Sequence, residues 1–316
     1  MKEQDLDSGF SMNDPIRPRG SRGGGMLPRS APREVSTRPQ PSDYPPVMPT
    51  AGAKGFGGRN AGRRILITTT PKGGVGKTFF LINLADWLAE KNVRSLSFDT
   101  DWASGTLTRF QPESRFVTAS EGDGLQEILV ALDEVDLVLV DGSAAAIPEI
   151  LEWVEASHLS GDGGGNGIGV TLAVMLEEDK DTVFQAGELC RRFGANVDWL
   201  AVRMLKTGPA TEIYDNSKTR QELLRLGAGE MTVARLPWNL LSIMQRTSKS
   251  LSGLMQDKSL SLLERHRLRS YQERLFEQFT AMESIILPRL NPRLGAGGNQ
   301  PGGSGSIRPR IAPEEV

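Results

Sequence analysis

Apolar and polar positions along the middle of the chain follow two alternating patterns. Short runs rich in β-branched and other apolar residues predict buried strands, and the stretches between them repeat apolar residues at helical spacing. The predicted strands are residues 65–69, 95–99, 135–140, 169–176, 197–204 and 231–234. The predicted helices between them are residues 79–90, 125–132, 148–156, 181–193 and 217–226. This order predicts an α/β fold built on a doubly wound, mostly parallel sheet.

After Leu236 and Pro237 the chain is predicted to be helical, which adds a C-terminal helical extension to the sheet. The predicted helices are residues 239–250 and 260–285. The second carries an apolar stripe near heptad spacing, formed by Leu268, Tyr271, Leu275 and Met282. Such a stripe is typical of a helix that packs on a sheet. A partner or dimer surface is the alternative, and its candidate arginines are Arg265, Arg267, Arg269 and Arg274.

Glycine and proline are abundant at both ends of the chain. Residues 1–63 contain ten Gly and nine Pro, a density that favours chain without a packed core. Residues 291–316 have a similar Gly-, Ser- and Pro-rich composition. We therefore predict a disordered arm at 1–63, one folded domain at 64–290 and a disordered tail at 291–316.

The formal net charge of −2 hides a basic segment. Residues 15–64 contain ten Lys and Arg against two acidic residues, so the arm is basic and the rest of the chain is acidic. A basic flexible arm could contact nucleic acid, anionic lipid or a protein. Solvated linkers without any partner often have the same composition, and this alternative stays open.

Cysteine use and hydropathy indicate the compartment. Cys190 is the only cysteine, so no internal disulfide can form. The first residues lack the apolar core of a signal peptide, and no apolar run is long enough to span a membrane. We expect a protein of the reduced cytoplasm.

The strongest chemical signal is a glycine-rich segment between the first predicted strand and the first predicted helix. It reads Pro71-Lys72-Gly73-Gly74-Val75-Gly76-Lys77-Thr78. Its glycines let backbone N–H groups turn toward an anion, and the helix N-terminus that follows adds its positive dipole end. Lys77 would then meet the β- and γ-phosphates of a nucleotide, and Thr78 would offer a hydroxyl to Mg2+. A turn that binds nothing is the alternative, but two lysines in one loop repel each other unless an anion compensates them.

The same segment resembles a known motif. Thr70 or Pro71 stands where the phosphate-loop pattern usually has its first Gly, yet Lys72 to Thr78 is similar to the deviant Walker A motif of the ParA/MinD family of ATPases. The resemblance extends over about residues 64–290. It implies a P-loop NTPase fold with ATP and Mg2+ as ligands. It also implies an ATP-dependent homodimer in which Lys72 reaches the phosphates of the other subunit.

A pair of carboxylates follows the second predicted strand. The family has an Asp-x-Asp pattern there, and this chain has Asp99-Thr100-Asp101. The resemblance assigns Asp101 to orienting the attacking water, because a carboxylate at the C-terminal end of a strand faces the phosphate crevice. The family often continues with Pro-Gln, whereas this chain has Trp102-Ala103. A carboxylate that only caps the turn is the alternative.

Asp141 ends the apolar run at 135–140. The resemblance implies a Walker B aspartate, which holds Mg2+ through its water shell. Gly142, Ser143 and Ala144 supply the small residues that the family has after this aspartate. A plain strand-capping role is the alternative.

The base pocket departs from the family pattern. Met204 stands where the family commonly has the Asn that reads adenine. Backbone groups near Leu236 and Pro237 could still read the base. ATP is therefore implied by the resemblance, and GTP stays open.

The resemblance favours an ATPase, slow and stimulated by a partner, that acts as a dimerisation switch and positions cargo. The segment 214–220 and the final helix are similar to plasmid partition and transfer ATPases, which suggests plasmid DNA, a DNA-bound adaptor or a transfer complex as cargo. A membrane anchor is not expected, because Glu314 and Glu315 close the chain where membrane-positioning members carry an amphipathic helix. The alternatives are a nucleotide-binding scaffold without efficient turnover and a metabolic enzyme on the same fold. The tryptophans Trp87, Trp153, Trp199 and Trp238 are expected to pack in the core or between helices.

Overall fold

A seven-stranded parallel sheet forms the centre of the protein. The computed structural model describes residues 62–120, 124–159, 167–206 and 211–288. The strands are β1 (Arg63–Thr68), β2 (Ser95–Asp99), β3 (Arg115–Phe116), β4 (Leu137–Asp141), β5 (Ile168–Leu176), β6 (Asp198–Leu205) and β7 (Gly229–Ala234). They lie in the order β3-β2-β4-β1-β5-β6-β7, and every neighbouring pair is parallel. The predicted α/β fold is confirmed. The predicted tail and residues 1–61 of the predicted arm lie outside the described residues, whereas Arg63, which was assigned to the arm, begins β1.

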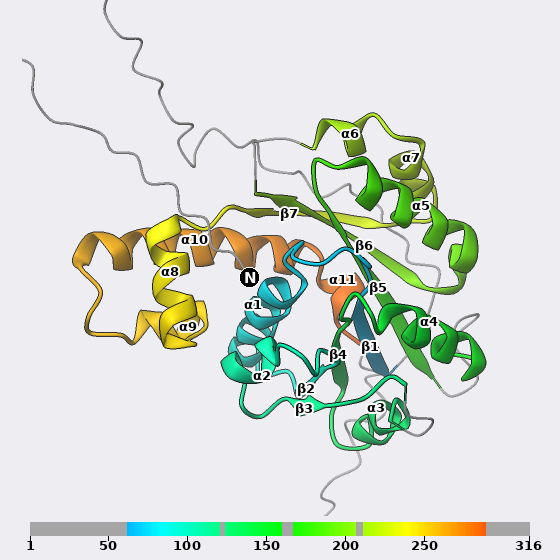
Figure 1. Ribbon diagram of the computed structural model, residues 1–316, viewed down its shortest axis with the longest axis horizontal. Helices are drawn as coiled ribbons and strands as arrows, with labels where there is room; N and C mark the ends of the chain where they lie inside the picture. The colour runs from blue at the N-terminus through cyan, green and yellow to red at the C-terminus, as the bar shows by residue number, and fades with distance from the viewer. Residues whose placement is uncertain (1–61, 121–123, 160–166, 207–210, 289–316) are drawn as a thin grey trace, which may run out of the picture. The chain divides into compact units, whose positions relative to one another are not determined.

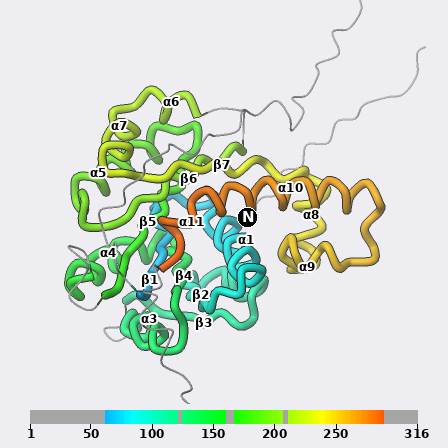
Figure 2. Tube along the Cα trace, turned by 180° about the vertical axis from the view of Figure 1, so that it is seen from behind, coloured from blue at the N-terminus to red at the C-terminus, as the bar shows by residue number. Residues whose placement is uncertain are grey.

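Helices cover both faces of the sheet (Figure 1). One face carries α3 (Gln126–Ala131), α4 (Ile147–Ala156), α5 (Lys180–Phe193), α6 (Glu212–Asp215) and α7 (Lys218–Arg225), with a 3-10 turn at Gly194–Asn196. The other carries α1 (Lys77–Glu90), α2 (Thr106–Phe110), α8 (Trp238–Thr247), α9 (Leu251–Met255), α10 (Leu262–Ala281) and α11 (Glu283–Ile286). Figure 2 shows α10 along the same side of the sheet as α1.

Strand alternation explains why both faces are covered. Ile65 and Ile67 of β1 pack under the first group of helices, while Leu66 between them packs under the second. All three side chains are fully buried. Because successive side chains of a strand point to opposite faces, an unbroken apolar run requires cover on both sides. The same holds for β4, whose five residues are all buried.

The predicted elements are present, and the ones that prediction missed are short. β3, α2, α6 and α9 each have two to five residues, too few for a periodic pattern to emerge. The predicted helix 260–285 is divided at Met282 into α10 and α11. Trp87, Trp153 and Trp199 are buried as expected. The expectation for Trp238 was wrong, because its side chain is 68% exposed at the start of α8.

The C-terminal helices pack on the sheet through the predicted stripe. Leu268, Tyr271, Leu275 and Met282 are all buried. The Tyr271 hydroxyl donates a hydrogen bond to the Ala234 carbonyl at the end of β7 (2.6 Å). The packing interpretation of the stripe is therefore confirmed, and the arginines of α10 lie on its exposed faces. In the described part of the chain, no helix is both long and apolar enough to cross a membrane.

A buried ion pair joins β1 to β6 across the intervening strand β5. Arg64 of β1 donates from Nη1 to Asp198 of β6 (2.7 Å) and to the hydroxyl of Thr171 on β5 (2.6 Å). Thr171 in turn donates to the Ile285 carbonyl of α11 (2.8 Å). Arg64 is only 1% exposed. Although it was counted with the basic arm, its charge is enclosed in the sheet.

We expect Arg64→Met to destabilise the fold by about 3 kcal/mol, because it leaves the Asp198 carboxylate buried without the charge that compensates it. Arg63→Met is the matched control, since Arg63 pairs with Asp133 at the surface and exposed pairs contribute less than about 1 kcal/mol. Urea unfolding curves of both variants would measure the difference. Equal losses would contradict a special role for the buried pair.

Candidate functional site

The candidate site lies where the strands end around β1. β1 is flanked by β4 and β5, so the strand order reverses beside it. In open parallel sheets, ligands bind outside the carboxyl ends of the strands at such a point. The glycine-rich segment follows β1 directly and leads into α1. The predicted site residues therefore have the position that the fold favours for a ligand.

Thr70 anchors the segment to β5. Its hydroxyl donates to the Met175 carbonyl (2.9 Å) and accepts from the Met175 N–H (2.8 Å). These bonds explain the departure from the usual phosphate-loop pattern. Thr70 stands in the region of the usual first glycine, and its hydroxyl satisfies both backbone groups of Met175 on the neighbouring strand.

The glycines give the segment its curvature. Gly74 and Gly76 have φ angles of 71° and 101°, which side-chain-bearing residues rarely adopt. Gly76 caps α1 without a side-chain hydrogen bond to the first turn. The N–H groups at this helix end are therefore suited to an anion.

Lys77 is the first residue of α1 and lies beneath the segment. Its Nζ donates to the carbonyls of Thr70 (2.8 Å) and Lys72 (2.9 Å). Burial lowers the pKa of Lys77, and the charges of Asp141 and Asp101 oppose that shift. The ammonium thus lies in a crevice with carboxylates on one side and the glycine-rich segment on the other.

Asp141 ends β4 within this crevice. Its carboxylate accepts hydrogen bonds from the hydroxyls of Thr78 and Thr68, the latter at 3.3 Å. Burial and the nearby charge of Asp99 raise the pKa of Asp141 to about 6, against the opposing effects of Thr78 and Lys77. A carboxylate and a hydroxyl in contact are oxygen groups of the kind that Mg2+ prefers, directly or through water. The two residues predicted for the metal are therefore brought together.

Asp101 has the geometry of a turn cap. Its carboxylate accepts from the N–H and the hydroxyl of Ser104, at 3.1 and 2.6 Å. Asp99 holds the turn from below by accepting from the Asp101 N–H (2.9 Å). Asp101 still lies close enough to influence the pKa of Lys77. Its assignment to the attacking water stays a prediction.

The Lys72 side chain reaches the acidic residues that follow β5. Its Nζ forms an ion pair with Asp179 and lies 3.8 Å from a Glu177 oxygen. Lys72 is 37% exposed, so it remains accessible at the edge of the segment. Its predicted contact with a second subunit stays a prediction.

Comparison with known proteins identifies the family. Residues 66–271 match the model of the CobQ/CobB/MinD/ParA nucleotide binding domain. The chain belongs to this family. The suspected relationship to the ParA/MinD family of P-loop ATPases is confirmed. A search of curated proteins found no match.

Solved structures of family members are similar to this chain at low identity. The MinD cell division protein of Aquifex aeolicus is 12% identical, with 68% of this chain and 97% of that chain covered and a TM-score of 0.40. A ParA family ATPase from Chlorobium tepidum TLS is 13% identical, with 71% and 100% covered and a TM-score of 0.39. A putative plasmid partition protein from Borrelia burgdorferi B31, bound to AMPPNP, is 12% identical, with 69% and 98% covered and a TM-score of 0.41.

Sequence reasoning missed three charged residues at this P-loop domain's site. Glu177 and Asp179 follow β5, and Lys206 follows β6. The Lys206 Nζ donates to the Gly74 carbonyl and pairs with Glu177 at 2.8 Å. The signal was available, because charged residues directly after parallel strands reach the same edge as the P-loop.

Met204 and Pro237 are the residues that the sequence predicts beside the base. Met204 is buried, and a Cβ added to Gly76 would lie 2.5 Å from the Met204 methyl group. Met204 therefore packs against the P-loop. Pro237 caps α8 and accepts from the Leu241 N–H (3.0 Å). Leu241 lines a pocket of about 280 Å3 beside Thr78, between α1, α2 and α8. A base-binding role for Pro237 stays a prediction.

Gly142 explains why a small residue follows Asp141. A Cβ at Gly142 would lie 2.3 Å from the Thr68 carbonyl oxygen, closer than real Cβ atoms come. The Gly142 N–H also donates to the Thr68 hydroxyl (3.1 Å). Any larger residue must push the end of β4 away from β1, and Asp141 with it.

We expect Gly142→Ala to destabilise the protein by about 1–3 kcal/mol, because the backbone of Thr68 cannot move as freely as a side chain. Gly73→Ala is the matched control, since a Cβ there meets no described atom within 4 Å. Thermal unfolding without nucleotide would compare the two. A Gly142 variant as stable as the Gly73 variant would contradict this close contact.

Proposed function

We propose that the chain binds ATP with Mg2+ and hydrolyses it slowly, as a switch between a monomer and an ATP-bound homodimer. The observation that carries the proposal is the convergence of Lys77, Thr78 and Asp141 beneath a glycine loop of positive φ at the reversal point of the sheet. Such a combination suits a polyphosphate and a hard divalent cation together.

Each group has a role in this proposal. The backbone N–H groups of residues 73–76 surround the phosphates, and Lys77 exchanges the carbonyls of Thr70 and Lys72 for phosphate oxygens. Thr78 and Asp141 hold Mg2+, Asp141 through water. The bound metal supplies positive charge against the phosphate oxygens. Asp101 orients the attacking water once its carboxylate leaves Ser104.

Lys72 makes the switch depend on a second subunit. Within one chain its charge is neutralised by Asp179 and Glu177. When two ATP-bound chains meet, Lys72 leaves these acids and contacts the partner's phosphates. Hydrolysis removes that contact and releases the dimer. A symmetric pair of such contacts makes dimerisation depend on nucleotide at both sites.

The proposed cargo is plasmid DNA, a DNA-bound adaptor or a transfer complex. The basic arm predicted from the sequence would contribute by contacting phosphates, and its binding would weaken steeply with salt.

A cytoplasmic location is part of the proposal. Burial raises the pKa of Cys190 to about 12, which keeps this thiol protonated and unreactive.

A second candidate is a nucleotide-binding scaffold without efficient turnover. The bonds from Ser104 to Asp101 favour it, because they occupy the carboxylate that hydrolysis requires. Phosphate release by the parent protein, measured with Mg2+ and with cargo DNA present, separates the two. Release above a Lys77→Ala background supports the switch, and ATP binding without release supports the scaffold.

We expect Lys77→Ala to abolish ATP binding, because it removes the ammonium that faces the phosphates. Lys91→Ala is the control, since it removes the same charge at the other end of α1. Isothermal titration calorimetry on both variants, after circular dichroism has shown that they fold, would measure the loss. ATP affinity unchanged in the Lys77 variant would refute the proposed phosphate site.

We expect Lys72→Ala to keep ATP binding, with a modest loss, and to lose ATP-dependent dimerisation. Lys77 still neutralises the phosphates within one chain, whereas Lys72 is the group that approaches the other subunit. Size-exclusion chromatography with light scattering, with ATP and with ADP, would measure the mass of parent and variant. A variant that dimerises like the parent, or a parent that never dimerises, would count against the switch.

A further inference from the structure

Lys206 contacts the P-loop from outside the glycine-rich segment. It follows β6, and its Nζ donates to the carbonyl of Gly74 in the middle of the loop. The same ammonium forms an ion pair with Glu177 at 2.8 Å. Lys206 is 39% exposed, so a ligand at the loop could reach it.

Glu177 divides its two oxygens between two lysines of the loop region. Oε1 pairs with Lys206, and Oε2 lies 3.8 Å from the Nζ of Lys72. The Glu177 side chain is 19% exposed. A carboxylate bound in this way supplies the negative charge that phosphates would otherwise bring to the loop.

Three ammonium groups surround one glycine loop. Lys72, Lys77 and Lys206 all have their Nζ atoms on its backbone or on the acids beside it. Burial lowers the pKa of Lys77, and the charge of Lys206 acts in the same direction, so the two ammonium groups repel each other. A polyphosphate is the ligand class whose charge matches such a group of cations.

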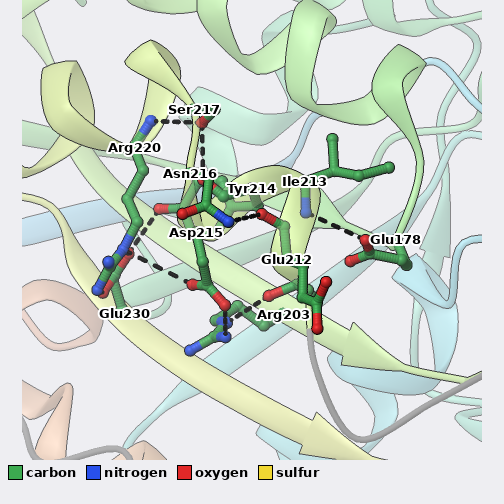
Figure 3. A network of polar contacts seen from close by, with 11 residues as sticks. Glu178, Arg203, Glu212, Ile213, Tyr214, Asp215, Asn216, Ser217, Arg220 and Glu230 are labelled. Carbon is green, nitrogen blue, oxygen red and sulfur yellow. Dashed lines mark hydrogen bonds and ion pairs between the residues drawn. The ribbon is translucent and has the colours of Figure 1, made fainter.

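A network of polar contacts joins β6, the strand that Lys206 follows, to α6 and α7 (Figure 3). Arg203, three residues earlier, donates to the hydroxyl of Thr211 and to Asp215, both at 2.7 Å. Glu178, the neighbour of Glu177, accepts from the N–H of Ile213 (3.1 Å). The residues on both sides of 207–210 are therefore attached to the ends of β5 and β6.

Glu230 of β7 is the buried centre of this network. It accepts a bidentate pair of bonds from Arg220 (2.9 and 3.0 Å) and one from the Tyr214 hydroxyl (2.7 Å). Burial acts to raise the pKa of Glu230, but the bonds from Arg220 and Tyr214 outweigh it and the pKa is lowered. The charged network holds α6 and α7 against β6 and β7.

We propose that Lys206 is an additional phosphate-binding residue of the nucleotide site, and that Glu177 occupies it until nucleotide arrives. This inference rests on the proposed ATP binding. Phosphate oxygens replace the Glu177 oxygen at Lys206, and the loop keeps its charge balance throughout. Glu177 is thus a competitor of the nucleotide, and the two residues have opposite effects on affinity.

The test measures ATP affinity by calorimetry in two variants with matched controls. Lys206→Met should weaken ATP binding about tenfold, the usual loss for one charge-assisted contact. Glu177→Gln should tighten it several-fold, because the competing charge is gone while the side chain keeps its shape. The controls are Lys218→Met, an exposed lysine at the start of α7, and Glu149→Gln, which removes the same charge from an exposed position on α4. Both controls should bind ATP as the parent does.

Tripolyphosphate provides a second probe, because it carries the phosphates without a base. Lys206→Met should weaken its binding as it weakens that of ATP, and a loss confined to ATP would overturn the assignment to phosphate. Unchanged ATP affinity in the Lys206 variant, or weaker binding in Glu177→Gln, would also overturn the inference while leaving ATP binding by the parent intact. A folded parent that binds neither ATP nor tripolyphosphate would instead remove the proposed function, and this inference with it.

Discussion

The position of β1 at the centre of the sheet is the constraint on which the site depends. Its side chains are buried on both faces, and its backbone pairs with β4 on one side and β5 on the other. Parallel pairing aligns the carboxyl ends of these strands. The P-loop after β1, Asp141 at the end of β4 and Glu177 after β5 therefore meet in one crevice, although they come from distant parts of the sequence. Burial of apolar strands thus produces a polar site.

Charge balance is the second constraint on this site. The crevice contains lysines from the P-loop and from the end of β6, and carboxylates from the ends of β2, β4 and β5. Each lysine has a carbonyl or a carboxylate as its partner. Under the proposed function, a phosphate chain competes with these groups of the protein, which couples the strength of binding to residues outside the loop.

The sequence predicted the regular part of the fold well, because buried parallel strands leave an apolar signal that does not depend on their neighbours. β2 has its predicted bounds, and the other long strands differ by one or two residues. Trp238 shows the limit of such reasoning. A large aromatic residue favours burial on average, but at the first turn of α8 no other described element covers it. Composition predicts how many apolar side chains are buried, and packing selects which ones.

For the site, the sequence by itself determined the glycine loop, Lys77, Thr78 and Asp141, because each belongs to a local pattern at the end of a strand or the start of a helix. Only the tertiary structure showed that the Thr70 hydroxyl bonds the backbone of β5, that Gly142 lies against Thr68, and that Lys72 and Lys206 share Glu177. Lys72 and Asp179 are 107 residues apart, and Lys206 and Gly74 are 132 apart. Local patterns carry no information on such pairs. The order of the strands in the sheet brings these residues together, and that order depends on how the whole chain buries its apolar side chains.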